Sequence, residues 1–344
     1  MKDRVNIAII DATANAAGEL HACNRAARYL TPIANLPLIC HVLDELAGSG
    51  IRRAQIVADR SVQAELERVV EGGRPWDIDV SYAESRASDR LAGVLDEVGR
   101  ALDSGPVLVH PGDCLFPRQV ATMCDRLLTD AVDLVLLEAE ARTSRGDLRG
   151  EPAEPVGVSE TPILFAPSSR LVLDELVGRP EHGRDFVDSL LISDLRIAVC
   201  DLAEHWCYGT STDALLAANR MMLDALPVPA VHGAFSGENK VHGRVAISPG
   251  AHVTGCTLHG PIVIDDGAVL QDCFVGPYTA ISTGAVLTGA ELDNSMVLAG
   301  AEIHHPGTRI EGSIIGERAR VGRSFDLPRG LHLRLGPGSQ VTLS

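Results

Sequence analysis

Lysine is almost absent from this chain of 344 residues. Of its 30 basic residues, only Lys2 and Lys240 are lysines. A genome that prefers arginine codons would by itself produce this bias. Arginine does not simply replace lysine, because its planar fork requires a different geometry from that of a compact ammonium group. A reaction that depends on a lysine therefore has only these two residues to use.

The sequence also lacks several features of membrane and nucleic-acid-binding proteins. No apolar run approaches the ~20 residues that a membrane span requires, and residues 1–4 lead into a strand-like run without a signal-peptide pattern. The net charge is −16, from 30 basic and 46 acidic residues. That balance leaves no basic footprint for nucleic acid. We therefore expect a cytoplasmic protein without a nucleic-acid or membrane partner.

None of the eight cysteines forms a C-x-x-C pair. Scattered cysteines are typical of reduced, partly buried thiols in a reducing compartment. A zinc or disulfide framework is accordingly not expected.

From Val241 onward, aliphatic residues recur every six positions with glycine, alanine or small polar residues between them. Val241, Leu258, Val275 and Leu292 are each seventeen positions apart. This hexad period fits neither an α-helix nor a half-buried strand. It predicts a parallel β-helix with three short strands per coil and stacked aliphatic side chains. The register loosens after Leu292, and two alternating segments at 331–335 and 340–343 are expected to cap the open end.

The first 225 residues alternate between strand and helix patterns. Strands are expected at 5–10, 55–58, 78–82, 107–110, 134–137, 163–165 and 196–200, and helices at 37–46, 62–70, 91–102, 170–177, 185–191 and 211–223. Such alternation predicts an α/β fold with a doubly wound, mostly parallel sheet. Ligands bind such sheets beyond the carboxyl ends of the strands. Residues 226–240 are expected to form a linker before a β-helix domain at 241–344.

Several segments resemble the sugar-1-phosphate nucleotidyltransferases. They are the segment 29–39 before a helix, the strand at 107–116 that ends in Gly112 and Asp113, the stretch 206–224, and the β-helix segments 310–316 and 327–331. The chain is most similar to the long form of glucose-1-phosphate thymidylyltransferase, and this resemblance implies that the β-helix is left-handed. The family joins a nucleoside triphosphate to a sugar 1-phosphate and releases pyrophosphate, using Mg²⁺.

The resemblance also assigns roles to individual residues. Ala12, Thr13, Ala14 and Arg90 occupy nucleotide-binding positions, and Asp185 stands where the family has a sugar-binding glutamate. Arg28 aligns with a catalytic lysine, and Asp113 matches a metal-binding aspartate.

Most of these positions depart from the family pattern. The glycines that allow backbone N–H groups to approach phosphates are replaced at Thr13, Ala14 and Ala16, and Glu19 adds negative charge there. A second lysine, which contacts the sugar phosphate, has no counterpart. The second metal-binding carboxylate aligns with Cys207, and a single carboxylate holds Mg²⁺ weakly. Since losing one charge-stabilising donor can cost about 10²–10³ in rate, these changes together predict impaired catalysis.

Three functions remain open. The first is a catalytically silent relative that binds a nucleotide, a sugar phosphate or an active nucleotidyltransferase subunit, as a regulator or scaffold. The second is an active enzyme with a rearranged site and Mg²⁺. The third is a β-helix acyltransferase or assembly module, in which His304 or His305 would serve as base.

Three structural alternatives accompany these roles. In these alternatives, Asp113 caps a helix that begins near Pro117, Arg28 is a surface residue, and the two histidines face solvent. The flat flank of a β-helix further predicts a homo-oligomer.

Overall fold

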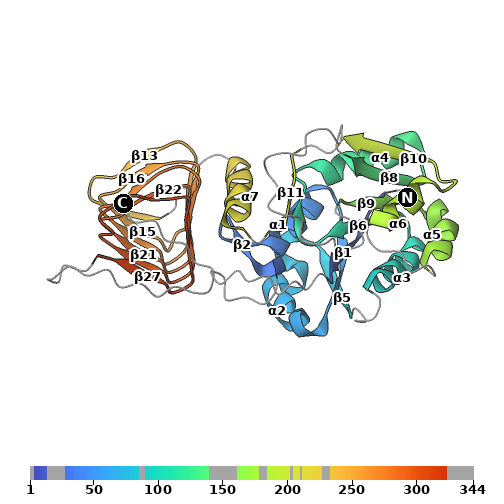
Figure 1. Ribbon diagram of the computed structural model, residues 1–344, viewed down its shortest axis with the longest axis horizontal. Coiled ribbons are helices and arrows are strands. Elements are labelled where there is room, and N and C mark those ends of the chain that lie inside the picture. Colours follow the sequence, from blue (N-terminus) through green and yellow to red (C-terminus); the bar gives the residue numbers. More distant parts are fainter. Residues whose placement is uncertain are drawn as a thin grey trace.

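A computed structural model describes residues 4–13, 28–84, 90–138, 161–177, 184–201, 204–209, 211–226 and 233–323. Its first part is built on a seven-stranded sheet (Figure 1). In spatial order the strands are β10 (Ile197–Asp201), β8 (Leu134–Glu138), β9 (Ile163–Phe165), β6 (Val107–Pro111), β1 (Ile7–Ala12), β4 (Arg53–Ala58) and β5 (Asp79–Glu84). Only β9 runs antiparallel to its neighbours. The mostly parallel sheet is confirmed.

Helices cover both faces of this sheet, as a doubly wound fold requires. One face packs against α1 (Leu38–Gly48), α2 (Arg60–Val70) and α4 (Gln119–Asp130), and the other against α3 (Arg90–Leu102), α5 (Arg170–Val177) and α6 (Arg184–Leu191). Successive side chains of β1 alternate between the faces, so that Ile10 belongs to the first core and Ile9 to the second. Both are fully buried, which explains why the strand is apolar from Ile7 to Ile10.

Four two-residue strands and three short 3₁₀ helices complete the first part. They are β2 (Pro32–Ile33), β3 (Leu36–Pro37), β7 (Cys114–Leu115) and β11 (Trp206–Cys207), with η1 (Arg28–Leu30), η2 (Glu71–Trp76) and η3 (Pro167–Ser169). β2 and β3 form an antiparallel hairpin, and β7 pairs with β11. Within the described ranges, the helices are too short or too polar to cross a lipid bilayer.

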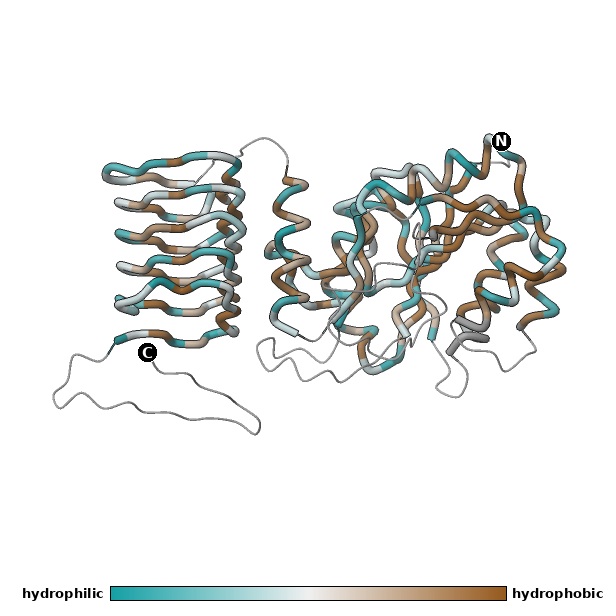
Figure 2. Tube along the Cα trace, turned by 45° about the horizontal axis from the view of Figure 1, so that its top comes forward, coloured by the Kyte–Doolittle hydropathy of each residue, from teal (hydrophilic) through white to brown (hydrophobic). Residues whose placement is uncertain are grey.

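The second part is the expected left-handed parallel β-helix. Its three faces are parallel sheets, and Figure 2 shows the coils stacked on one another. The first sheet contains β12 (Ala234–Ser236), β15 (His252–Thr254), β18 (Val269–Gln271), β21 (Val286–Thr288), β24 (Glu302–His304) and β27 (Arg320–Gly322). The second contains β13 (Lys240–His242), β16 (Thr257–His259), β19 (Phe274–Val275), β22 (Glu291–Asp293) and β25 (Ile310–Glu311). The third contains β14 (Val245–Ile247), β17 (Ile262–Ile264), β20 (Thr279–Ile281), β23 (Met296–Val297) and β26 (Ile314–Ile315).

The register confirms the seventeen-residue period. Val241 pairs with Leu258, Leu258 with Val275, and Val275 with Leu292. The last three are fully buried, whereas Val241 is 37% exposed because its coil lies near the open end of the stack. After Leu292 the next partner in this sheet is Ile310, one residue later than the period predicts. The extra length lies in the turn that contains His305, which has a positive φ of 44°.

The boundary of the β-helix differs from the expectation. β12 lies inside the expected linker 226–240, yet it already pairs with β15. Parallel pairing therefore begins at Ala234 rather than at Val241. The expected capping segments at 331–335 and 340–343 lie outside the described residues.

The helix α7 (Thr212–Asp224) lies between the two parts (Figure 1). The side chain of Asn219 on this helix accepts a hydrogen bond from Ala34 N (3.0 Å) and donates one to Tyr278 O (2.9 Å). Asn35 at the tip of the β2–β3 hairpin donates to Ile281 O (2.8 Å) and accepts from Ser282 Oγ (2.8 Å). Two asparagines thus join the hairpin to the β-helix.

Candidate functional site

The strand order changes direction at β1, because the chain continues to β4 and β5 on one side of β1 and then returns to β6 on the other side. In open α/β sheets, ligands bind at this kind of switch point, beyond the carboxyl ends of the strands. Ala12 ends β1, and Asp113 follows the carboxyl end of the neighbouring β6. The structure therefore places two of the sequence-derived candidates at the edge where a ligand crevice is expected.

Gly112 brings Asp113 close to the end of β1. Its backbone N–H donates to Asp11 O (2.9 Å). A Cβ at this position would lie 2.9 Å from both Asp11 O and Ile10 Cγ2, which is too close. Glycine is therefore required here for the two backbones to approach each other.

Arg28 forms an ion pair with Asp113. Its Nη1 donates to Asp113 Oδ2 at 2.6 Å, and the side chains are 6% and 18% exposed respectively. The sequence left open that Arg28 is a surface residue and that Asp113 caps the following helix. Both alternatives are wrong: Arg28 is buried, and α4 begins after Arg118 with no side-chain cap.

Only Nη1 of the Arg28 guanidinium takes part in this ion pair. Nε and Nη2 are buried and have no hydrogen-bond partner in the part of the chain that is described. These two N–H groups form one edge of the planar fork, the edge that matches two oxygens of a carboxylate or phosphate. The Tyr208 ring lies 5.1 Å from Arg28 Cζ and stabilises the cation. A buried, unsatisfied donor edge costs free energy unless an acceptor fills it.

Cys207, which aligns with the family's second metal-binding carboxylate, lies on the strand that pairs with β7. β11 pairs with β7 so that Cys207 faces Cys114, and Tyr208 N donates to Asp113 O (3.0 Å). Cys114 Sγ in turn lies 3.6 Å from Asp113 Oδ1. Burial, followed by the hydrogen bond with Cys207, raises the pKa of the Cys114 thiol well above its usual range.

These residues do not fit a family-type Mg²⁺ site. Mg²⁺ prefers hard oxygen ligands in a near-octahedral shell, whereas Asp113 is neutralised by Arg28 and its expected partner position holds the thiol of Cys207. In the described ranges, no three His, Cys, Asp or Glu residues come together as metal ligands. No catalytic step through Mg²⁺ follows from this arrangement.

The nucleotide-loop candidates are partly described. Thr13 is buried, and both its N–H (3.0 Å) and its Oγ1 (2.7 Å) donate to Asp11 Oδ1. The hydroxyl is therefore turned back onto β1 in a local Asx-type turn. Ala12 is buried as well, and Ala14 lies outside the described residues.

Two other candidates lie on helices. Arg90 begins α3, after β5, two strands away from β1 on the same edge of the sheet. Asp185 is the second residue of α6, which packs with α3 and α5 on one face of the sheet. The backbone thus places neither residue directly beside the ion pair of Arg28 and Asp113.

The histidines of the acyltransferase alternative lie in the β-helix. His304 ends β24 with a half-exposed side chain, and its Nε2 is 3.9 Å from Glu302 Oε2. His305 occupies the following turn and is exposed. The solvent-facing placement expected of such a pair is therefore present, and the acyltransferase role stays a prediction.

Sequence reasoning missed two groups at the site. Tyr208 was not expected to stack on Arg28, and Cys114 was not expected beside Cys207. A two-residue strand gives no periodic signal in the sequence. The alignment of Cys207 with the family's metal-binding carboxylate was therefore the only sequence signal for the β7–β11 ribbon.

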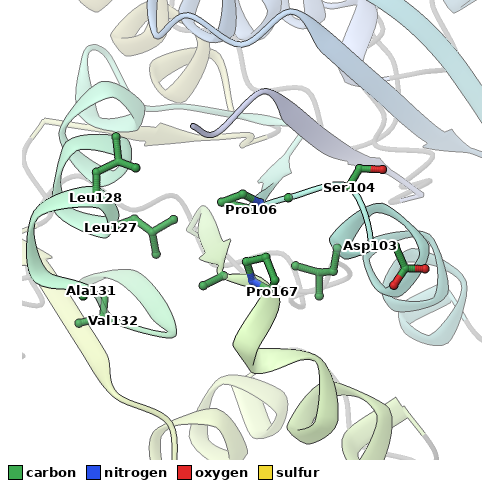
Figure 3. Close-up of a pocket in the computed structure, with 11 residues that line it drawn as sticks. Asp103, Ser104, Pro106, Leu127, Leu128, Ala131, Val132 and Pro167 are labelled. Carbon is green, nitrogen blue, oxygen red and sulfur yellow. The ribbon is translucent and has the colours of Figure 1, made fainter. Parts of the chain in front are cut away.

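A separate apolar groove of about 460 Å³ lies at the opposite, amino-terminal edge of β6 (Figure 3). Pro106, Leu127, Leu128 and Pro167 contribute its apolar surface, with Asp103 at the rim. Because ligands of doubly wound sheets bind at the other edge, this groove is not part of the candidate site.

The fold defines a two-part class of protein, in which a doubly wound α/β domain is followed by a left-handed β-helix. No protein-family profile matches the chain. A glucose-1-phosphate thymidylyltransferase of Streptomyces antibioticus is 26% identical, over 92% of this chain and 94% of its own. A mannose-1-phosphate guanylyltransferase of Mycobacterium tuberculosis is 25% identical, over 86% and 76% respectively. The chain is thus a distant relative of the sugar-1-phosphate nucleotidyltransferases.

Among solved structures, the chain is similar to one from Bacillus anthracis, described as a glucose-1-phosphate thymidylyltransferase in complex with a sucrose. The identity is 14% and the TM-score 0.49, and the match covers 62% of this chain and 94% of that one.

Proposed function

We propose that this protein binds a nucleotide or sugar phosphate at the switch point of its sheet without transferring the nucleotide at an enzymatic rate. The observation that carries the proposal is the ion pair between Arg28 and Asp113. The carboxylate that aligns with the family's metal ligand is bonded to a buried guanidinium, and the same guanidinium keeps a second edge for an oxyanion.

Support for binding comes from electrostatics. A buried guanidinium keeps its charge, because arginine is not deprotonated in proteins. Asp113 compensates this charge through Nη1, but the donors Nε and Nη2 still require acceptors. A phosphate presents two oxygens with the matching geometry. The ligand would therefore be recognised through the side edge of Arg28.

Support for the lack of catalysis comes from the groups that nucleotidyl transfer requires. Phosphoryl chemistry depends on positioned cations and metal ions that neutralise charge on the moving group. This chain offers Cys207 where a carboxylate is expected, and no lysine in the segment 142–156. A site of this composition can hold a phosphate, but it gives little preferential stabilisation to a transition state.

An active enzyme remains the second candidate, because the alignment with two curated enzymes covers most of the chain. In the first candidate, the protein would regulate or scaffold an active nucleotidyltransferase subunit. The division into an α/β domain at 1–225 and a β-helix domain is part of both proposals.

Turnover separates the two candidates. We expect no pyrophosphate release above background from any of the common nucleoside triphosphates with glucose 1-phosphate and Mg²⁺. Calorimetry without Mg²⁺ should nevertheless detect binding of a nucleoside triphosphate or of glucose 1-phosphate. Release that requires Mg²⁺ and that the charge-preserving variant Asp113→Glu abolishes would instead establish the active enzyme.

The variant Arg28→Lys tests the binding mode. Lysine can keep the charge beside Asp113 but has no planar edge. Losing one charge-assisted hydrogen bond costs about 1.5–3 kcal/mol, or roughly tenfold to a hundredfold in Kd. Arg52→Lys, at a half-exposed residue, is the matched control and should leave Kd unchanged. Equal affinities of both variants for phosphate ligands would contradict the proposal.

A further inference from the structure

Cys114 and Cys207 are direct cross-strand partners in the β7–β11 ribbon. Directly opposite residues of an antiparallel pair have Cα atoms about 4.5–5.5 Å apart, and disulfides form at about 4.4–6.8 Å. Both side chains are thiols in the structure, and they contact each other through a hydrogen bond. A disulfide therefore fits here without a change in the strand pairing.

The two thiols differ in access to solvent. Cys207 is exposed, whereas Cys114 is 3% exposed. Reagents in solution thus reach Cys207 first, and Cys114 is placed to react next with whatever forms on Cys207. Reactive cysteines are usually partly exposed, and buried ones inert.

We propose that Cys207 is an oxidation site for low-molecular-weight disulfides and that Cys114 is its resolving thiol. The Cys207 thiolate attacks one sulfur of the reagent, whose S–S bond breaks, and the first reagent thiolate leaves and takes up a proton. The Cys114 sulfur then attacks Cys207 Sγ and displaces the second reagent thiolate, which takes the Cys114 proton. Two electrons and two protons pass to the reagent, which becomes two thiols.

The second step is the slow one. Cys114 is only 3% exposed, so access to its sulfur is restricted and its attack on the adduct is slower than the first reaction. Asp113 Oδ1, at 3.6 Å from Cys114 Sγ, is the acceptor beside the thiol proton. The mixed disulfide on Cys207 should therefore accumulate before the protein disulfide appears.

Formation of the Cys114–Cys207 disulfide would also change the surroundings of Asp113 and Arg28 in the candidate site. The disulfide removes the Cys114 S–H donor from Asp113 and fixes β7 to β11, which carries Cys207 next to Tyr208 and hence next to Arg28. This effect on ligand binding rests on the proposed function, whereas the disulfide itself does not.

The β-helix contains a natural control. Cys273 N donates to Cys256 Sγ (3.4 Å), and the hydrogen bond from the Cys273 thiol lowers the pKa of Cys256 to about 7. This second pair is 1% and 3% exposed. It is chemically activated but shielded, so it should not react in the folded protein.

Folded full-length protein would be treated with oxidised glutathione, quenched by alkylation and mapped by peptide mass spectrometry. We expect a glutathione adduct on Cys207, then a Cys114–Cys207 disulfide that dithiothreitol reverses. Cys114→Ser should stop at the adduct, and Cys207→Ser should give neither product. Unreacted Cys207 would overturn the proposal, as would a disulfide between Cys256 and Cys273 in its place. Because mapping needs no phosphate ligand, its result is independent of the binding assays.

Discussion

Arg28 and Asp113 occupy charged positions of the resemblance, but they bind each other rather than substrate and metal. The two side chains form a direct ion pair of 2.6 Å. Breaking such a buried pair by removing one member costs about 3–5 kcal/mol, because the remaining charge is left uncompensated. Tests of this site should therefore use substitutions that preserve charge, such as Arg28→Lys.

Asp133 provides the clearest pH dependence. Hydrogen bonds from Arg196 and Ser168 lower the pKa of its carboxyl group below the usual value, against the effect of burial. A depressed native pKa stabilises the fold above the unfolded value of about 3.9, and this stabilisation is lost as the pH falls further.

Asp133→Asn should therefore lower Tm at pH 7 by about 2–8 °C, the effect of one or two charge-assisted hydrogen bonds. The gap between the Tm values of wild type and variant should narrow below pH 4, because the carboxyl group of unfolded wild type then binds a proton and the folded carboxylate does not, which favours unfolding. Asp174→Asn, whose half-exposed carboxylate pairs with Arg170 on the surface of α5, is the control. A gap that stays constant down to pH 2 would show that the ion pair is not its source.

At the scale of elements, the hexad pattern was the most informative signal. Each inward position, such as Leu270, contacts equivalent residues of the coils above and below, and the sequence repeats this requirement coil after coil. Leu270 is fully buried, and its neighbour Val269 on the same strand is 39% exposed.

Leu270→Ala should destabilise the β-helix by about 2–5 kcal/mol, through lost burial and a cavity. Val269→Ala, on the same strand, should change stability by only about 0.5 kcal/mol. Urea denaturation followed by circular dichroism measures both. Similar effects of the two variants would mean that the inward and outward assignments are wrong.

The sequence predicted the regular elements well, since strands and helices of the α/β part begin and end near the expected residues. It could not predict contacts between distant residues without periodicity. Arg28 and Asp113 are separated by 85 positions, and β7 and β11 are two residues long. The start of the β-helix was placed too late because the end coil leaves Val241 partly exposed and β12 is exposed throughout.

At the scale of the whole molecule, Asn219 connects three segments of the chain. It is fully buried and bonds to the hairpin at Ala34 and to the β-helix at Tyr278. Asn219→Ala should therefore cost about 1–3 kcal/mol for each backbone group left unpaired. Hydrogen exchange should become faster at the amide of Ala34.

Arg244→Ala is the matched control at the same junction. Arg244 bonds to Asp224 at the end of α7, but both side chains are well exposed, and such pairs contribute about 0–1 kcal/mol. Unchanged exchange at Ala34 in Asn219→Ala would mean that the hairpin is held by other contacts. The homo-oligomer and the active partner subunit remain predictions that this junction does not test.

The two asparagines also limit how the chain can be recombined. Asn35 lies near the beginning of the sequence and Asn219 near the end of the α/β part, yet both bond to coils beyond residue 277. A chimaera that exchanges the β-helix with that of a relative at a single crossover would separate each donor from its acceptor. Functional shuffling would need to exchange the hairpin, α7 and the coils together, so that these three segments form one unit of inheritance.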